Sequence, residues 1–98
     1  MRAEPIDAAR AEAIGLVGSV VDAERLADET YDYARRLADG PPIAQGFTKR
    51  GLHRALDSEL AEMLAWEADA QAECSHTADA HEGVHAFLER RKPVFRGS

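Results

Sequence analysis

The residues whose types and spacing could perform chemistry lie in the stretch HEGVH at positions 81–85. On a helix, His81 and His85 share one face, and zinc peptidases use this spacing to hold a zinc ion, with the intervening Glu82 as general base. A catalytic zinc needs a third protein ligand. Glu89 continues the i, i+4, i+8 ladder, but its Cα would lie about 12 Å along the axis from that of His81. These side chains would converge poorly on one ion, so we predict no metal site.

No other catalytic arrangement takes its place. The sequence contains no GxSxG, Walker or GxGxxG motif. Cys74 and His76 would reach the histidine pair only if the turn at 74–77 folded back onto the helix that follows. A lone cysteine near a histidine is also more often inert than nucleophilic. We therefore predict no catalytic residue, and two solvent-facing histidines on an amphipathic helix.

Composition and charge describe a small helical protein with an acidic body. The 98 residues suffice for one domain, 45% of them are apolar, and the chain is rich in alanine and poor in aromatic residues. This composition favours helices over sheets. The net charge is −6, with 8 basic and 17 acidic side chains in residues 1–88, and four basic and one acidic in residues 89–98. An acidic body disfavours nucleic acid and anionic membrane surfaces, so we expect neither partner.

The sequence carries no signal for export or membrane insertion. Its single cysteine, Cys74, allows no internal disulfide, which fits a reducing compartment. No apolar run approaches the roughly 20 residues that a membrane span requires. The N-terminal stretch MRAEPIDAARAEA has no apolar signal core and carries acids early. We therefore expect a cytoplasmic protein.

Helices must position these residues. Capping residues, apolar repeats and breakers predict helices at 8–14, 23–38, 42–55, 59–74 and 78–91. The predicted N-caps are Asp7, Asp22, Asp57 or Ser58, and Thr77, and the predicted stops include Gly15 and Pro93. The β-branched stretch LVGSVV at 16–21 predicts an isolated strand or an extended link. The result is an all-α fold of about five short helices with one short extended segment.

Apolar spacing predicts which faces of three helices are covered. The repeats are Leu26, Thr30, Tyr33 and Leu37; Leu60, Leu64, Ala68 and Ala72; and Ala80, Val84, Phe87 and Leu88. Residues at this spacing lie on one face of a helix. In the second repeat the small residues would let another helix approach closely, and we expect the third repeat to point inward.

Three stretches follow one known pattern in order and spacing. They are EPIDAARAEAIGLVGSVVD at 4–22, ADGPPIAQGFTKRGLHRAL at 38–56 and HTADAHEGVHAFLERRKPVFRG at 76–97. They are similar to the A-x-x-A-x-x-x-G-L-V-x-x-V-V, G-P-P-x-A-x-x-x-x-K and D-x-x-E-G-x-x-A-F segments of the crotonase superfamily, the enoyl-CoA hydratases and isomerases. Since His81 and His85 fall at variable positions of the last segment, this resemblance makes HEGVH a coincidence.

The resemblance implies the helical C-terminal (trimerisation) region of a crotonase fold without its β/α spiral core. We expect one domain over 1–98, in which 1–22 form a remnant helix and an extended segment at the core edge. Residues 23–98 would then form the helical oligomerisation region. The implied assembly is a homo-oligomer, either a trimer or, without the core, a dimer or a domain-swapped form.

The resemblance also limits the expected activity. Family members take the backbone amides of their oxyanion hole and their catalytic acids from earlier segments that have no counterpart here. An enolate without preorganised donors loses what is usually the largest catalytic contribution. We therefore expect a truncated or partial enoyl-CoA hydratase/isomerase-like protein that is inactive alone. Two alternatives stay open: a subunit that completes a separately encoded hydratase core, and a stand-alone helical interaction module.

One edge of an acyl-CoA site is implied as well, with no resident cofactor. In the family, a Phe and a basic residue three positions later approach the adenosine diphosphate end of coenzyme A on a neighbouring subunit. Here these positions are Phe87 and Arg90, the latter in place of the usual Lys. An aromatic ring can border an adenine, and Arg can donate charge-assisted hydrogen bonds to a 3′-phosphate. Core packing of Phe87 and a solvated charge at Arg90 are the alternatives.

Overall fold

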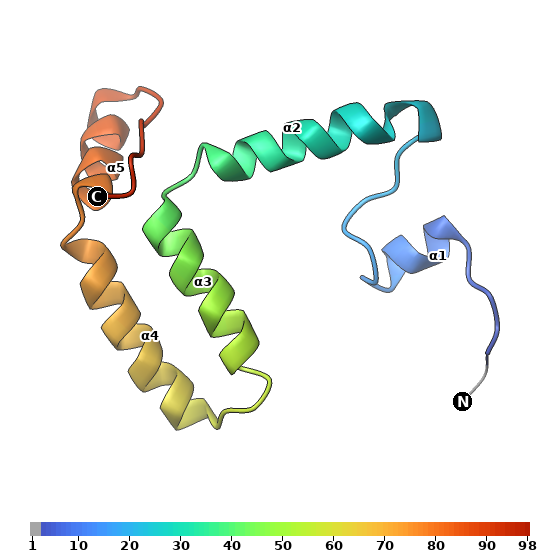
Figure 1. Ribbon diagram of the computed structural model, residues 1–98, viewed down its shortest axis with the longest axis horizontal. Coiled ribbons are helices and arrows are strands. Elements are labelled where there is room, and N and C mark those ends of the chain that lie inside the picture. The colour runs from blue at the N-terminus through green and yellow to red at the C-terminus, as the bar shows by residue number, and fades with distance from the viewer. Residues whose placement is uncertain (1–2) are drawn as a thin grey trace. The chain divides into compact units, whose positions relative to one another are not determined.

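The regular elements of residues 3–98, the part that this computed structural model describes, are all helices (Figure 1). In chain order they are α1 (Ala8–Ala13), a 3-10 turn (Ala23–Arg25), α2 (Leu26–Ala38), α3 (Pro42–Arg54), α4 (Leu60–Ser75) and α5 (Ala78–Glu89). The predicted all-α class is confirmed. The chain divides into two compact units, of which the first ends at Ala34 and the second covers Arg35–Ser98.

The first unit contains α1 and an irregular connection. The Asp7 side chain caps α1 by accepting from the Arg10 backbone N–H at 2.8 Å. The helix ends just before Gly15, whose φ of 74° is the left-handed conformation that glycine adopts at little cost. Residues 16–21 form no strand, so the strand option is wrong; this connection bends at residues 16–18 and has no regular structure at 19–21. It is held to α1 by the Val20 N–H, which donates to Glu12 Oε1 at 2.9 Å.

The helix predicted over 23–38 has an irregular start. The segment Ala23–Arg25 is a 3-10 turn, and the α-helix begins only at Leu26. Asp22 is the N-cap residue, as predicted, but its side chain makes no capping hydrogen bond. The apolar residues of the predicted face, including Tyr33 and Leu37, are more than half exposed. This helix therefore has the predicted amphipathic pattern, but the large apolar residues of that face are exposed among the described residues.

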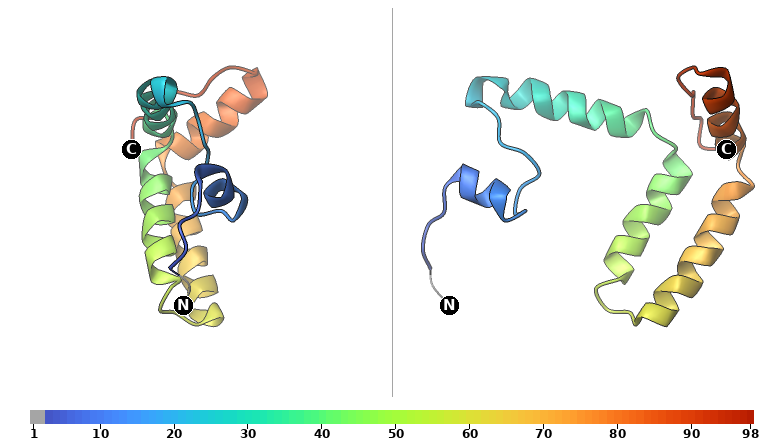
Figure 2. Two further views of the ribbon diagram at one scale, coloured as in Figure 1. Left: turned by 90° about the vertical axis from the view of Figure 1, so that its right-hand side faces the viewer. Right: turned by 180° about the vertical axis from the view of Figure 1, so that it is seen from behind.

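Helices α3 and α4 form an antiparallel hairpin, and they lie side by side in both views of Figure 2. Helix α3 starts at Pro42, in the first helical position, where the missing N–H costs no bond. Helix α4 starts later than expected, because the turn closed by the Asp57 N–H to Arg54 O bond at 3.1 Å delays helical geometry until Leu60. The predicted cap at Asp57 or Ser58 is wrong, since the N-cap residue is Glu59.

The hairpin packs through a different face of α4 from the one predicted. The ring centroids of Phe47 and Trp66 lie 6.1 Å apart, and the Arg50 guanidinium carbon lies 4.4 Å from the Phe47 centroid. A Cβ on the buried Gly51 would lie 2.6 Å from Trp66 Cζ3, so this glycine permits the close approach. The stripe expected to receive another helix is exposed: Leu60, Leu64, Ala68 and Ala72. The face of α4 that packs against α3 is the one that carries Trp66, because a large aromatic side chain gains most from burial.

Helix α5 has the predicted start and a shorter end. The Thr77 hydroxyl accepts from the Ala80 backbone N–H at 3.1 Å, as an N-cap should. The helix was predicted to reach residue 91 and stop before Pro93. It ends at Glu89 instead, because Arg90 adopts a left-handed conformation with φ 56°.

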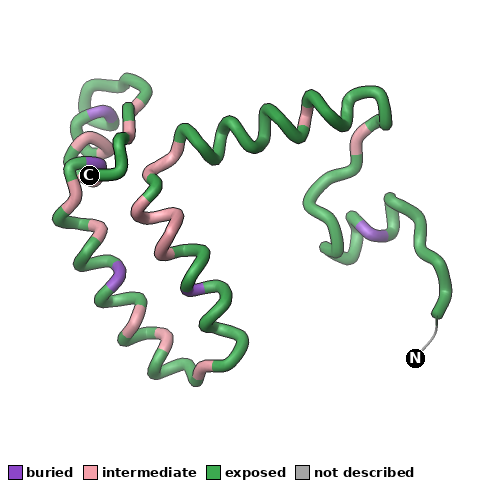
Figure 3. The backbone as a smooth tube through the Cα atoms, viewed as in Figure 1, coloured by how far each residue is buried: buried purple, intermediate pink, exposed green. Residues whose placement is uncertain are grey.

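Within the described residues, the buried apolar side chains are three alanines: Ala11, Ala70 and Ala86 (Figure 3). The prediction that Val84, Phe87 and Leu88 point inward is wrong, because they are 59%, 82% and 72% exposed. Each helix is formed, but none has a large apolar residue fully buried among those described. None of the described helices combines the length and apolarity needed to cross a bilayer.

Candidate functional site

The two predicted coenzyme A residues lie together at the C-terminal end of α5. Phe87 belongs to its last turn and Arg90 is its C-cap residue. The Arg90 backbone N–H donates to Phe87 O at 3.2 Å, which ties the two positions within one turn. Phe87 is 82% exposed, so core packing within this chain does not account for it. An exposed aromatic residue and an exposed cation thus lie at the same end of α5.

The turn that carries Arg90 is a helix C-cap in which Arg90 adopts the left-handed αL conformation. The Arg91 N–H donates to Ala86 O at 3.0 Å, while the Arg90 N–H points to the carbonyls of Ala86 and Phe87. Such a closure satisfies helix carbonyls that would otherwise lack donors. Glycine usually occupies the left-handed position, because a Cβ there costs roughly 1–2 kcal/mol. Among the described residues, Arg90 is the one non-glycine residue with positive φ.

Glu82 binds the residue that follows Arg90. Its two carboxylate oxygens accept from Arg91 Nη1 at 2.5 Å and Nη2 at 2.8 Å, and Oε1 also accepts from the Val94 N–H at 2.9 Å. Glu89 accepts from Arg91 Nε at 2.6 Å. The Arg91 and Val94 bonds lower the pKa of Glu82 to about 2. The same two carboxylates raise the pKa of Arg91 above its ordinary value.

Asp79 binds the end of the chain. This residue is only 4% exposed, and its carboxylate accepts from the Arg96 N–H at 2.7 Å and the Gly97 N–H at 2.8 Å. Its own backbone N–H donates to Ser98 O at 3.2 Å. Sequence reasoning did not select Asp79 or Glu82 as site residues. One local signal was present for Asp79, which lies in the first turn of a capped helix, where negative charge is favoured; Glu82 lies beyond that turn.

The side chains of the zinc-like stretch HEGVH do not converge on a common site. His81 and His85 are exposed. Glu82, which would have to act as the general base, is held in a two-pronged ion pair with Arg91. Across residues 3–98, the structure shows no group of three or more His, Cys, Asp or Glu side chains that could hold a metal ion. The geometry therefore offers no support for metal-dependent peptide hydrolysis.

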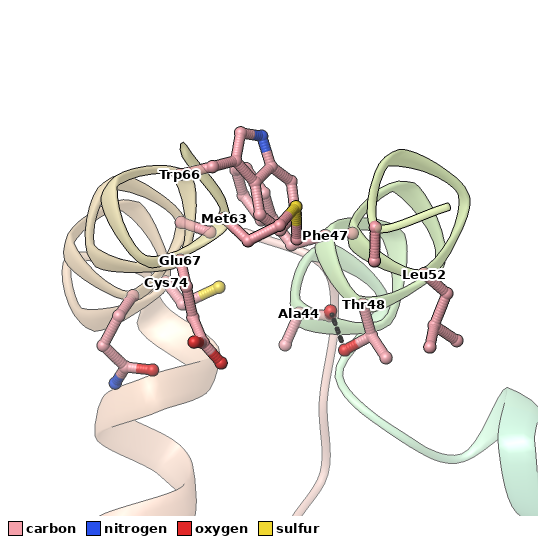
Figure 4. A pocket seen from close by; sticks show the side chains of 12 residues that line it. Ala44, Phe47, Thr48, Leu52, Met63, Trp66, Glu67 and Cys74 are labelled. Carbon is pink, nitrogen blue, oxygen red and sulfur yellow. Dashed lines mark hydrogen bonds between the residues drawn. The ribbon is translucent and has the colours of Figure 1, made fainter. Parts of the chain in front are cut away.

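A groove of about 530 Å³ runs between α3 and α4 (Figure 4). Phe47 and Leu52 line it from α3, and Met63, Trp66 and Cys74 line it from α4. Most of this surface is apolar, and the Thr48 hydroxyl is turned back to Ala44 O at 3.0 Å. The groove can accept apolar groups, and its polar lining includes Glu67 and Gln71.

Comparison with known proteins gives one consistent answer. The family model for enoyl-CoA hydratase/isomerase matches residues 1–98. The 1,2-epoxyphenylacetyl-CoA isomerase of Escherichia coli K12 is 38% identical over 92 residues, and the short-chain-enoyl-CoA hydratase of Clostridium acetobutylicum is 32% identical over 90. The crystal structure of an enoyl-CoA hydratase from Polaromonas sp. JS666 superposes with a TM-score of 0.90 at 32% identity.

The matches cover nearly all of this chain and a minor part of each relative. The E. coli alignment covers 94% of this chain and 35% of the isomerase. The Clostridium alignment covers 92% and 34%, and the Polaromonas superposition covers 95% and 36%. The chain therefore spans about a third of the length of the relatives it matches.

Proposed function

This chain belongs to the enoyl-CoA hydratase/isomerase family, and from that membership we propose that its residues form a self-associating helical part of an enzyme acting on acyl-CoA. In this role they border the coenzyme A moiety and do not perform the chemistry. The observation that carries the proposal is the exposed pair at the end of α5, where Phe87 is 82% exposed beside the cation of Arg90. The resemblance assigns these two positions to the adenosine diphosphate end of coenzyme A.

The chemistry of the pair suits that ligand. Coenzyme A carries an adenine, a diphosphate and a 3′-phosphate. An exposed phenylalanine ring can border the adenine, and a guanidinium can donate two hydrogen bonds to a phosphate. The neighbouring cations are already engaged, since Arg91 binds Glu82 and Lys92 Nζ binds Asp39 Oδ2 at 2.7 Å. Arg90 is therefore the cation of this turn that we assign to the phosphate.

The apolar side chains that the helices leave exposed support the proposal of self-association. Leu60, Leu64 and Leu88 are 74%, 56% and 72% exposed, and the buried apolar side chains among the described residues are alanines. Exposed apolar surface on this scale marks an interaction surface. We propose a trimer or a dimer of this chain, with coenzyme A bound across subunits. We place it in the cytoplasm, in keeping with its single unpaired Cys74.

We also propose that the 98-residue chain alone does not hydrate enoyl-CoA. An enolate intermediate requires donors aimed at its oxygen. The described carboxylates with lowered pKa values are those of Glu82 and Asp39, and ion pairs with Arg91 and Lys92 occupy both. A group held in this way is a poor proton donor near neutral pH. Steady hydration of crotonyl-CoA by the purified chain would contradict this statement.

Two measurements on the purified chain test the proposal. Light scattering should give the mass of a trimer or dimer, and calorimetry should show coenzyme A binding that Arg90→Glu removes. Arg54→Glu, on the exposed end of α3, is the matched charge control. An unbound, monomeric chain would instead favour a subunit that covers a separately encoded core, and adding such a core should then restore hydration. An oligomer that ignores coenzyme A would favour the helical interaction module.

A further inference from the structure

Residues 91–98 fold back along α5, and two acids of that helix hold them there (Figure 2). We call α5 together with residues 91–98 the clasp. Asp79 and Glu82 lie three positions apart, one helical turn, on the side of α5 that receives the returning chain. Between them they accept hydrogen bonds from the backbone N–H groups of Val94, Arg96 and Gly97.

The near side of the clasp fixes the residue after Arg90. Arg91 is bound by both oxygens of Glu82, at 2.5 Å and 2.8 Å, and by Glu89 at 2.6 Å. Paired bonds between a guanidinium and a carboxylate set orientation as well as distance. Because the Arg91 N–H also donates to Ala86 O at 3.0 Å, both the backbone and the side chain of this residue are held.

The far side of the clasp is anchored by a buried group. Asp79 is 4% exposed and holds two consecutive N–H groups, those of Arg96 and Gly97. Gly97 has a φ of 76°, and a Cβ built there would lie 3.1 Å from Pro42 Cγ at the start of α3. The returning chain is thus fixed at both ends, with the left-handed turn at Arg90 before it.

A left-handed arginine is uncommon, and it persists only where its surroundings determine it. The hydrogen bonds of Glu82 and Asp79 constrain this turn from outside it, because they hold the residues that follow Arg90. If they were lost, the turn could relax to other backbone conformations, and the Arg90 side chain would leave from a different direction. Phe87, inside the helix, would keep its position. The two members of the proposed site would then no longer be presented together.

We infer that Glu82 and Asp79 are positioning residues for the coenzyme A edge: by holding residues 91–97 against α5 they fix the left-handed turn from which Arg90 reaches the 3′-phosphate. This inference rests on the function proposed above. A positioning role differs from a merely stabilising one in its consequence. If these acids only stabilised the fold, their loss would not change the preference for coenzyme A over 3′-dephospho-coenzyme A while the helices remain intact.

The experiment compares the affinities of coenzyme A and 3′-dephospho-coenzyme A for the full chain by calorimetry. The wild type should prefer coenzyme A, and Glu82→Gln should lower that preference about fivefold, as expected for loss of a charge-assisted bond. Asp79→Asn should act in the same direction. Glu73→Gln, at an exposed acid on α4, should leave the preference unchanged. Circular dichroism on each variant verifies that helix content is retained.

The outcomes separate the inference from the proposal beneath it. If the wild type discriminates and both variants discriminate equally well, the inference is wrong and the coenzyme A edge stands. If the wild type binds both ligands alike, Arg90 does not read the 3′-phosphate, and the edge and the inference fail together. Should Glu82→Gln lose helix content, Arg91→Lys is the substitute, because it keeps the charge but not the planar two-pronged geometry. It should lower the preference about threefold.

Discussion

The α3–α4 hairpin and the clasp are held by opposite kinds of contact. In the hairpin, the Phe47 and Trp66 rings lie 6.1 Å apart, and Gly51 lets the helices come close. In the clasp, the Asp79 and Glu82 carboxylates accept from backbone N–H groups and from Arg91. One region is joined by apolar surface, and the other by directed polar bonds.

The difference indicates what each region must preserve. Apolar contact has no preferred direction, so the hairpin can pack through Trp66 while a groove of about 530 Å³ and the leucines at positions 60 and 64 stay exposed. Hydrogen bonds to carboxylates weaken steeply when their geometry is lost. The clasp therefore suits a turn whose shape matters, and Arg90 is in that turn. The surfaces that we propose for association are apolar, while the proposed ligand contact is fixed by polar bonds.

The largest expected effect comes from removing the buried acid of the clasp. Asp79→Ala leaves the Arg96 and Gly97 N–H groups without their acceptor, and each of these part-buried hydrogen bonds contributes roughly 1–3 kcal/mol. We expect the free energy of unfolding in urea to fall by about 3 kcal/mol and both amides to lose protection from hydrogen exchange.

The control is Asp28→Ala, which removes an exposed acid from the first turn of α2 and should cost no more than about 1 kcal/mol. Equal losses for the two variants would mean that helix-dipole charge, and not capture of the returning chain, accounts for the contribution of Asp79.

The hairpin has its own critical position at Gly51. Gly51→Ala places a methyl group 2.6 Å from Trp66 Cζ3, and overpacking of this kind costs typically 1–3 kcal/mol. Gly46→Ala, on the same helix, meets only the flexible end of Arg50 at 3.7 Å, so it should stabilise by about 1 kcal/mol. Thermal unfolding of the pair measures the contrast. Two stabilising alanines would show that the helices separate freely, and that the aromatic contact does not hold the hairpin.

Local signals in the sequence predicted most of the helices. Asp7 and Thr77 cap the helices that they were expected to cap, and proline opens α3 at Pro42 as predicted. Each of these signals acts within about one turn of the chain, so no knowledge of distant contacts is needed. The end of α5 was misplaced because a left-handed arginine has no local signature. The residues that we infer to hold this turn include Glu82, which lies eight positions before Arg90 and binds Arg91 and the Val94 N–H.

The faces of the helices were harder to predict than their bounds. Periodicity marks every apolar stripe but does not say which stripe meets a neighbour within this chain. On α4 the i+4 stripe through Leu64 is exposed, while the face through Met63, Trp66 and Ala70 meets α3. On α5, Phe87 follows the core pattern and is exposed. The coenzyme A edge was predicted only through the family resemblance, and its role stays a prediction.

A smaller and opposite effect is expected at the turn itself. Arg90→Gly removes the Cβ from a left-handed position, so it should stabilise the chain by about 1 kcal/mol. The same substitution removes the guanidinium that we assign to the phosphate, so affinity for coenzyme A should fall. Stability and binding would then change in opposite directions, measured by thermal unfolding and calorimetry. Arg90→Lys, which keeps both the Cβ and a charge, should leave stability unchanged; a stabilising lysine would contradict the strain argument.

The smallest expected effect is the response of the clasp to acid. The bonds from Arg91 and Val94 lower the pKa of Glu82 from 4.5 to about 2. Since the folded pKa lies below the unfolded one, the stabilisation is fully present above pH 4.5 and is lost as pH falls from 4.5 through 2. The Val94 amide resonance should therefore titrate near pH 2, and it should not titrate in Glu82→Gln. A midpoint near 4.5 in the wild type would mean that Glu82 is solvated and unpaired. The clasp would then be held by Asp79 alone, whose part-buried hydrogen bonds to the Arg96 and Gly97 N–H groups do not involve Arg91.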